Sequence, residues 1–206
     1  MTGTFITIDG PGGSGKSTTA AALAAALRSG GHAVHVTAEP SAGPIGVLTR
    51  AMVNQVHGHS LACLVAADRY HHLDTEIRPT RAAGQIVICD RYLASTLVLQ
   101  ARDGLPTPYL IAVNAGIDLP DLAVILSTSP EVITARIDQR GRHDRFEDDP
   151  HSARIERTLF GDTAVTLTGM GVHVCQLDTG LFTAQQAAGQ IADVLAARCA
   201  SLPSRG

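Results

Sequence analysis

The chain has 206 residues, of which 45% are hydrophobic and 17% charged, and its formal net charge at pH 7 is −3. This length suits a single domain with a substantial buried core. The slightly negative charge excludes a general attraction for nucleic acid or for an anionic membrane surface. The sequence shows neither a run of about 18 apolar residues, as a membrane span needs, nor the pattern of a signal peptide. We therefore expect a protein of the cytoplasm.

The cysteines and histidines do not form a recognisable metal motif. The four cysteines are scattered, with no C-x-x-C pair: Cys63, Cys89, Cys175 and Cys199. Reduced thiols packed as small core residues are expected, which also fits the cytoplasm. The pairs His57/His59 and His71/His72 lack the i, i+4 spacing of helical metal ligands, so we expect surface or partly buried imidazoles.

Short β-branched or apolar runs alternate with stretches of helical spacing along the chain. The runs lie at residues 4–8, 33–37, 86–89, 122–126 and 172–177. Helices are expected near residues 20–27, 61–77, 95–100, 109–115, 130–140, from about 152, and 183–199. This alternation is typical of βαβ units and predicts an α/β fold of three layers, with a five-stranded parallel sheet flanked by helices. No linker or repeat divides residues 1–206, so we expect one domain.

Residues 10–18, with the sequence GPGGSGKST, lie between the first expected strand and the first expected helix. In that context G-x-x-x-x-G-K-[ST] predicts a loop whose backbone amides and helix N-terminus hold phosphates. Lys16 is placed to reach the β- and γ-phosphates, and the Ser17 hydroxyl to bind Mg²⁺. The alternative is an ordinary flexible glycine turn. We expect a site for a nucleoside triphosphate formed by Gly10, Gly12, Gly13, Ser14, Gly15, Lys16, Ser17 and Thr18.

Asp90 and Arg91 directly follow the third expected strand, so they should lie beside this loop at the carboxyl edge of the sheet. The carboxylate can hold Mg²⁺, directly or through water, and the arginine can hold a second phosphoryl group. The alternative is an aspartate that only caps the following turn.

A second group of cations lies near the loop at residues 141–147. The phosphate loop contains no arginine, so this loop is the natural source of a cation that stabilises the transferred phosphoryl group. The alternative is a solvated charged loop in which Arg145 pairs with Glu147 or Asp148. The candidate arginines are Arg136, Arg140, Arg142 and Arg145.

Asp68 and Arg69 lie on the helix expected at residues 61–77. They are either adjacent charges at the surface or part of an acceptor pocket in which Asp68 orients Arg69.

Taken together, these motifs resemble the thymidylate kinase family of nucleoside-monophosphate kinases along nearly the whole chain. The supporting segments are the phosphate loop, Thr-Ala-Glu-Pro at 37–40, Ala-Ala-Asp-Arg at 66–69 with Pro79, Asp-Arg-Tyr at 90–92 with Ser95 and Gln100, Asn114, Pro-Asp-Leu at 120–122, and Asp-Arg-Phe-Glu at 144–147. The resemblance implies a three-layer P-loop kinase fold with an arginine-rich lid at about residues 141–149. It also implies ATP and Mg²⁺ as cofactors and a homodimer.

The chain departs from the family pattern at four positions of the expected acceptor site. Val65 replaces a phenylalanine that stacks on the base, and Leu99 replaces a tyrosine that packs against the sugar. Ala38 stands where arginine is common, and Gly12 stands where the loop usually has an acid, while Asp9 begins the loop. We therefore expect weaker discrimination between ribose and deoxyribose than in the family at large.

The resulting hypothesis is an ATP-dependent kinase that phosphorylates a nucleoside monophosphate, either dTMP or another pyrimidine or modified nucleotide. Lys16, Asp90, Arg142 and Arg145 are the expected catalytic residues, and Arg136 and Arg140 assist at the ATP. The expected acceptor site contains Asp9, Glu39, Pro40, Val65, Arg69, Arg91, Ser95, Leu99 and Gln100. Two alternatives stay open: a nucleoside kinase with Glu39 as general base, and a P-loop ATPase or nucleotide-dependent switch.

Overall fold

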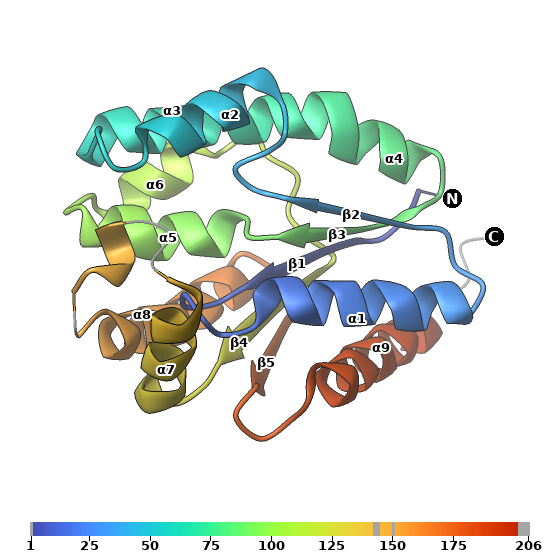
Figure 1. Cartoon of the computed structure of the whole chain (residues 1–206). Coiled ribbons are helices and arrows are strands. Elements are labelled where there is room, and N and C mark those ends of the chain that lie inside the picture. Colours follow the sequence, from blue (N-terminus) through green and yellow to red (C-terminus); the bar gives the residue numbers. More distant parts are fainter. Residues whose placement is uncertain (1, 142–144, 150, 202–206) are drawn as a thin grey trace.

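Five parallel strands form a sheet in the order β2–β3–β1–β4–β5, and helices cover both of its faces (Figure 1). The structure, a computed structural model, describes residues 2–141, 145–149 and 151–201. Each expected run overlaps one strand, so the predicted α/β fold is confirmed. The strands are β1 (Phe5–Asp9), β2 (Val34–Ala38), β3 (Ile86–Asp90), β4 (Leu122–Ser127) and β5 (Val174–Asp178).

Helices connect the successive strands, and one more helix follows the last strand. They are α1 (Lys16–Ser29), α2 (Pro44–Met52), α3 (Gly58–His72), α4 (Arg78–Ala82), α5 (Leu93–Arg102), α6 (Thr107–Val113), α7 (Pro130–Arg140), α8 (Ser152–Gly169) and α9 (Ala184–Ser201). Ser129 caps α7 as its sequence predicts, because its hydroxyl accepts a hydrogen bond of 3.3 Å from the Val132 amide. Among the described residues, none of these helices combines the length and the apolar character needed to cross a membrane.

Alternating strand residues serve the two faces of the sheet. Ile6 and Ile8 of β1 pack against α1 and α9, whose buried side chains include Leu23 and Ile191. Phe5 of the same strand faces the other core, which α3, α5, α6 and α8 cover. Because both faces are buried, the strands read as nearly continuous apolar runs in the sequence.

Two segments differ from the sequence-based expectation. Helix α2 was not predicted, since its apolar residues Val47 and Leu48 are about half exposed and its pattern is short. The helix expected at residues 61–77 ends as α-helix at His72 and continues as a π-helical turn, Leu73–Ile77, before α4. Helix α2 packs against α3, above β2 in the view of Figure 1.

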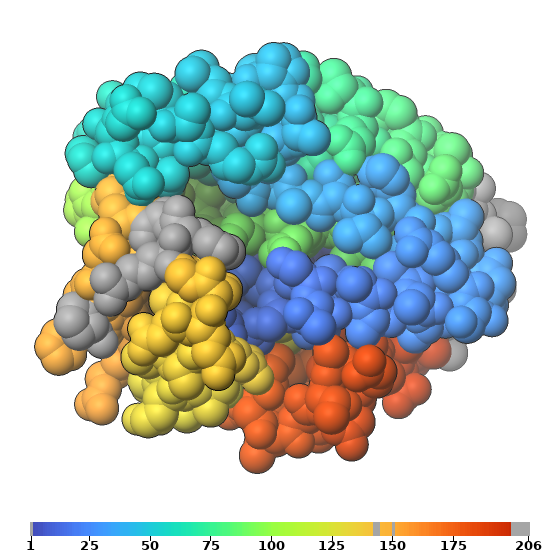
Figure 2. Space-filling view, viewed as in Figure 1, coloured from blue at the N-terminus to red at the C-terminus, as the bar shows by residue number. Residues whose placement is uncertain are grey.

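The carboxyl ends of β1, β2 and β3 meet at one edge of the sheet. Asp90 pairs in register with Ile8 on one side and with Ala38 on the other. Figure 2 shows this edge hollowed between α1, α7 and the α2–α3 layer. Of the expected lid, the structure describes Gly141, the 3₁₀ turn Arg145–Glu147 and the two residues after it; Arg142 lies outside the described residues.

Candidate active site

The loop between β1 and α1 is shaped for an anion. Gly10, Gly13 and Gly15 have φ angles of 148°, 74° and 90°, which side chains rarely tolerate. A β-carbon at Gly10 would also collide with the Leu126 carbonyl of β4. Gly15 caps α1 without any side-chain hydrogen bond, so the first amides of the helix stay available to a phosphate.

Lys16 is buried in this loop and held by the loop itself. Its Nζ donates hydrogen bonds to the carbonyls of Gly10, at 3.0 Å, and Pro11, at 2.7 Å. Burial lowers the pKa of Lys16 to about 7, and the nearby positive charge of Arg91 acts in the same direction. A phosphate at the loop would supply the negative charge that the buried ammonium lacks.

Ser17 and Asp90 join the phosphate loop to the end of β3. The Ser17 hydroxyl donates a hydrogen bond of 2.5 Å to Asp90 Oδ2. The other carboxylate oxygen, Oδ1, is buried and has no hydrogen-bond partner among the described residues. Mg²⁺ prefers oxygen ligands, and this pair supplies a hydroxyl oxygen and a carboxylate oxygen without a partner on any described residue. Ser17 and Asp90 therefore fit the metal role expected of them.

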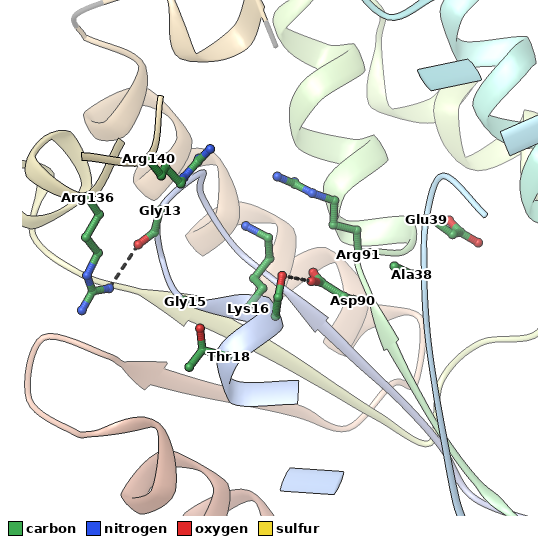
Figure 3. Close-up of a pocket in the computed structure, with 11 residues that line it drawn as sticks. Gly13, Gly15, Lys16, Thr18, Ala38, Glu39, Asp90, Arg91, Arg136 and Arg140 are labelled. Carbon is green, nitrogen blue, oxygen red and sulfur yellow. Dashed lines mark hydrogen bonds between the residues drawn. The ribbon is translucent and has the colours of Figure 1, made fainter. Parts of the chain in front are cut away.

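This loop forms one wall of a cavity of about 330 Å³ (Figure 3). Arg91 and Arg140 extend into it from opposite sides above Lys16. Arg136 turns back to the loop and donates a hydrogen bond of 3.1 Å to the Gly13 carbonyl. We call this space the donor cavity; its lining residues are Gly13, Gly15, Lys16, Ser17, Thr18, Ala38, Glu39, Asp90, Arg91, Arg136 and Arg140.

A smaller cavity, of about 90 Å³, adjoins the donor cavity, and Glu39 and Arg91 line both. We call it the acceptor cavity. Its walls come from α2, α3, α5 and the turn after α7, and they are largely apolar. It contains every residue expected in the acceptor site except Asp9, and the full lining is Glu39, Pro40, Thr49, Val53, Leu61, Val65, Asp68, Arg69, Arg91, Tyr92, Ser95, Thr96, Leu99, Gln100 and Phe146.

Arg69 is the polar centre of the acceptor cavity and is only 1% exposed. Its Nε and Nη2 both donate to Glu39 Oε2, at 2.9 and 2.7 Å. Further hydrogen bonds reach Asn114, at 2.7 Å, and Thr96, at 2.9 Å. The guanidinium is therefore fixed in one orientation before any ligand arrives.

Asp68 does not orient Arg69, contrary to one of the two sequence-based alternatives. Its carboxylate instead accepts hydrogen bonds of 2.6 Å from the Ser41 amide and from the Ser41 hydroxyl. Both residues are buried, so the alternative of two surface charges is also wrong. The reason is local: adjacent helix residues point about 100° apart.

Asp9 is fully buried and lines neither cavity, in contrast to its expected role at the acceptor. One of its oxygens accepts hydrogen bonds from the amides of Tyr92 and Ser95 and from the Ser95 hydroxyl, at 2.7 to 3.0 Å. Burial raises the pKa of this carboxyl. Asp9 thereby fixes the start of α5, which carries the acceptor wall.

The candidate arginines of α7 and of the turn after it divide into two groups. Arg136 and Arg140 line the donor cavity as expected. Arg145 does not: its guanidinium donates to both carboxylate oxygens of Asp103, at 2.8 and 2.6 Å, and lies 4.1 Å from the centre of the Phe146 ring. The pairing of Arg145 with Glu147 or Asp148, the other reading of this loop, is therefore replaced by a pairing with Asp103 that sequence reasoning missed.

Two acids near Gly12 were also missed as part of the site. Glu156 of α8 accepts a hydrogen bond of 3.2 Å from the Gly12 amide, and Arg140 binds Glu147 at 2.6 Å. Glu147 lies where a β-carbon on Gly12 would stand. The sequence pointed to Glu147 only through its place in the Asp-Arg-Phe-Glu segment. It gave no sign of Glu156, which is 144 residues from Gly12.

Comparison with known proteins agrees with this geometry. A model of the family "Thymidylate kinase" matches residues 8–158. A "Probable thymidylate kinase" of Pyrobaculum calidifontis is 40% identical over 147 residues, which cover 70% of this chain and 74% of the relative. A "Thymidylate kinase" of Clavibacter michiganensis subsp. michiganensis is 40% identical over 172 residues, or 78% and 82% of the two chains. One of Xanthomonas euvesicatoria pv. vesicatoria is 38% identical over 173 residues, or 82% and 75%. The chain therefore belongs to the thymidylate kinase family and is an ATP-dependent nucleoside-monophosphate phosphotransferase.

Proposed function

We propose that this chain transfers the γ-phosphoryl group of ATP to dTMP, giving ADP and dTDP. The observation that carries the proposal is the wall shared by the two cavities. Arg91 lines both, so a donor phosphate chain above Lys16 and an acceptor phosphate would meet at its guanidinium. Transfer then needs positioning and charge stabilisation more than acid–base chemistry.

At the donor side, the loop amides and Lys16 hold the phosphate chain. Arg136 and Arg140 add positive charge from α7 as negative charge develops on the transferred group. Ser17 and Asp90 would hold Mg²⁺, which would offset the negative charge of the phosphates. Arg145 is left out of this set because Asp103 binds it outside the donor cavity.

At the acceptor side, the cavity combines apolar walls with few polar groups, as ligand pockets commonly do. Val65, Leu99 and Phe146 offer apolar surface to a base, while Arg69 and Gln100 offer donors to its polar edge. The small volume favours a one-ring base, that is, a pyrimidine. Since Leu99 has no ring to fill the space beside the sugar, we propose that ribonucleotides are rejected only weakly.

The two alternative functions fit the contacts less well. A nucleoside kinase would need Glu39 as a general base; Arg69 holds its Oε2, so only Oε1 is open to that role. A nucleotide-dependent switch needs no acceptor cavity in which the Arg69 guanidinium is already held in one orientation. Neither alternative explains why Arg91 faces both spaces.

An acceptor screen tests the proposal. Purified protein with ATP and Mg²⁺ is offered dTMP, dUMP, dCMP, UMP, CMP and thymidine, with an acceptor-free reaction as control. We expect the highest kcat/KM with dTMP, measurable transfer to UMP, and only background rates with thymidine or without acceptor. ATP hydrolysis at the same rate with and without acceptors would contradict transfer, and a profile restricted to dTMP would contradict the weak sugar selection.

Three further expectations stay proposals: one domain, a cytoplasmic location and a homodimer. The last has some support at the surface, because Val47 and Leu48 of α2 are 55% and 50% exposed. Apolar residues in such a position suit contact with a second copy. Light scattering after gel filtration should give twice the chain mass, and Leu48→Asp should give the single mass.

A further inference from the structure

Three buried side chains from distant parts of the sequence meet beside the shared wall of the two cavities: Glu39 after β2, His72 at the end of α3, and Cys89 in β3. Their carboxylate oxygen, ring nitrogen and sulfur all lie within 4.8 Å of one another. Each residue is nine-tenths or more buried. Sequence spacing could not reveal this group, because its three members are far apart in the chain. The histidine pairs considered above, His57/His59 and His71/His72, do not include Glu39 or Cys89.

The contacts of His72 engage one ring nitrogen and leave the other without a hydrogen-bond partner among the described residues. Its Nε2 lies 2.8 Å from the Thr37 hydroxyl oxygen and 3.5 Å from Glu76 Oε2. In a neutral ring whose hydrogen points at these oxygens, Nδ1 has a lone pair. A histidine held in this way by a partner on its other nitrogen is the usual arrangement of a metal ligand.

His72 Nδ1 lies beside a carboxylate oxygen. Glu39 Oε1 is 3.5 Å away, and within the described part of the chain neither atom has a hydrogen-bond partner. Arg69 already holds the other oxygen of this carboxylate. Buried polar atoms without partners are costly, and a cation bound between these two would satisfy both.

The separation and the chemistry of the donors indicate which cation fits. Ligands at about 2.0–2.3 Å from a tetrahedral ion are about 3.3–3.7 Å apart, which matches the spacing of Nδ1 and Oε1. A set of sulfur, imidazole and carboxylate is typical of Zn²⁺ and unsuited to Mg²⁺. We propose that Glu39 Oε1, His72 Nδ1 and Cys89 Sγ bind one Zn²⁺-type cation, separate from the Mg²⁺ site at Ser17 and Asp90.

Binding requires the loss of one proton. The Cys89 thiol donates at 3.0 Å to the Arg91 carbonyl. The ion forms a bond to the sulfur while the thiol proton leaves to solvent, and the neutral imidazole binds without losing a proton. Because Glu39 also holds Arg69, occupancy of this site acts directly on the acceptor cavity.

Cobalt is the probe for the site. The reduced full-length protein is titrated with Co²⁺ in excess Mg²⁺, which fills the oxygen site. We expect one equivalent to bind with a sulfur-to-cobalt charge-transfer band that added Zn²⁺ abolishes. Cys89→Ser should remove the band, and His72→Gln, which can still reach Thr37, should weaken binding by at least about tenfold. The matched control is Cys175→Ser in β5, which should behave as the wild type.

A measurement on the unaltered chain covers the case in which a variant does not fold. X-ray absorption of the Zn²⁺-loaded wild type should show one sulfur at about 2.3 Å among nitrogen and oxygen ligands. No saturable Co²⁺ binding, a band that survives Cys89→Ser, wild-type affinity in folded His72→Gln, or a zinc shell without sulfur would each overturn the proposal.

Discussion

The Glu147 carboxylate occupies the space that a side chain on Gly12 would need. Through its contact with Arg140, the same carboxylate connects the turn after α7 to a residue that lines the donor cavity. An acid from the lid thus stands where the family often has an acid within the loop. The lid carboxylate can lie this close to the loop because residue 12 has no side chain.

We expect Gly12→Ala to lower kcat/KM by about tenfold, a cost of about 1.4 kcal/mol. The φ angle of Gly12 is not positive, so the backbone accepts alanine and the loss comes from the collision with Glu147. Steady-state kinetics of Gly12→Ala, Glu147→Ala and the double variant test this cause. The fold loss of kcat/KM in the double variant should be smaller than the product of the two single fold losses. A double loss equal to that product would contradict the contact.

Lys16 is the only lysine in the chain, which makes its pKa directly measurable. With a pKa of about 7, roughly half of its amine is uncharged at neutral pH, in contrast to about one part in a thousand for an ordinary lysine. Acylation by a small reagent, followed by mass spectrometry, should therefore rise with pH to a midpoint near 7. ATP should protect the amine, because phosphates favour its charged form. A midpoint near 10 without nucleotide would refute the shift.

Arg145→Ala separates a catalytic from a positioning role. Since Asp103 binds Arg145 beside Phe146 at the acceptor cavity, we expect acceptor KM to rise about three- to tenfold with little change in kcat. Asp103→Asn should have the same effect, and the double variant should be no worse than either single one. A fall in kcat of about a hundredfold confined to Arg145→Ala would restore the catalytic role that the sequence suggested.

Leu99→Tyr should strengthen the preference for deoxyribose. Leu99 lines the acceptor cavity, and an aromatic ring there would crowd a 2′-hydroxyl. We expect the ratio of kcat/KM for dUMP over UMP to rise about tenfold, mainly through loss of UMP activity, which corresponds to about 1.4 kcal/mol. Leu99→Met adds no ring and serves as the control. An unchanged ratio in Leu99→Tyr would show that another wall selects the sugar.

The sequence predicted the parts of this molecule that depend on local pattern. The strands, the phosphate loop and the Ser129 cap follow from apolar runs, glycine spacing and hydrogen-bonding side chains close in sequence. The sequence also predicted that Lys16, Ser17 and Asp90 lie together, because the loop and a strand end must share one edge of a parallel sheet.

Contacts between distant segments could not be predicted in this way. The partners of Arg69 lie 27 to 45 residues away, and Arg145 meets Asp103 across 42 residues. Whether an arginine faces a ligand or a carboxylate depends on helix packing, which no local pattern encodes. For the same reason Asp68, next to Arg69 in sequence, has a different partner.

The division of the two cavities has a consequence for how such enzymes diversify. The donor cavity is lined largely by the loop, α7 and the end of β3, whereas the acceptor cavity is lined largely by α2, α3 and α5. Under the proposed function, substitutions on those helices, as at Val65 and Leu99, would alter which nucleotide is consumed and leave the residues around the loop in place. Descendants of one ancestral catalyst can exchange their substrate while they keep the same reaction.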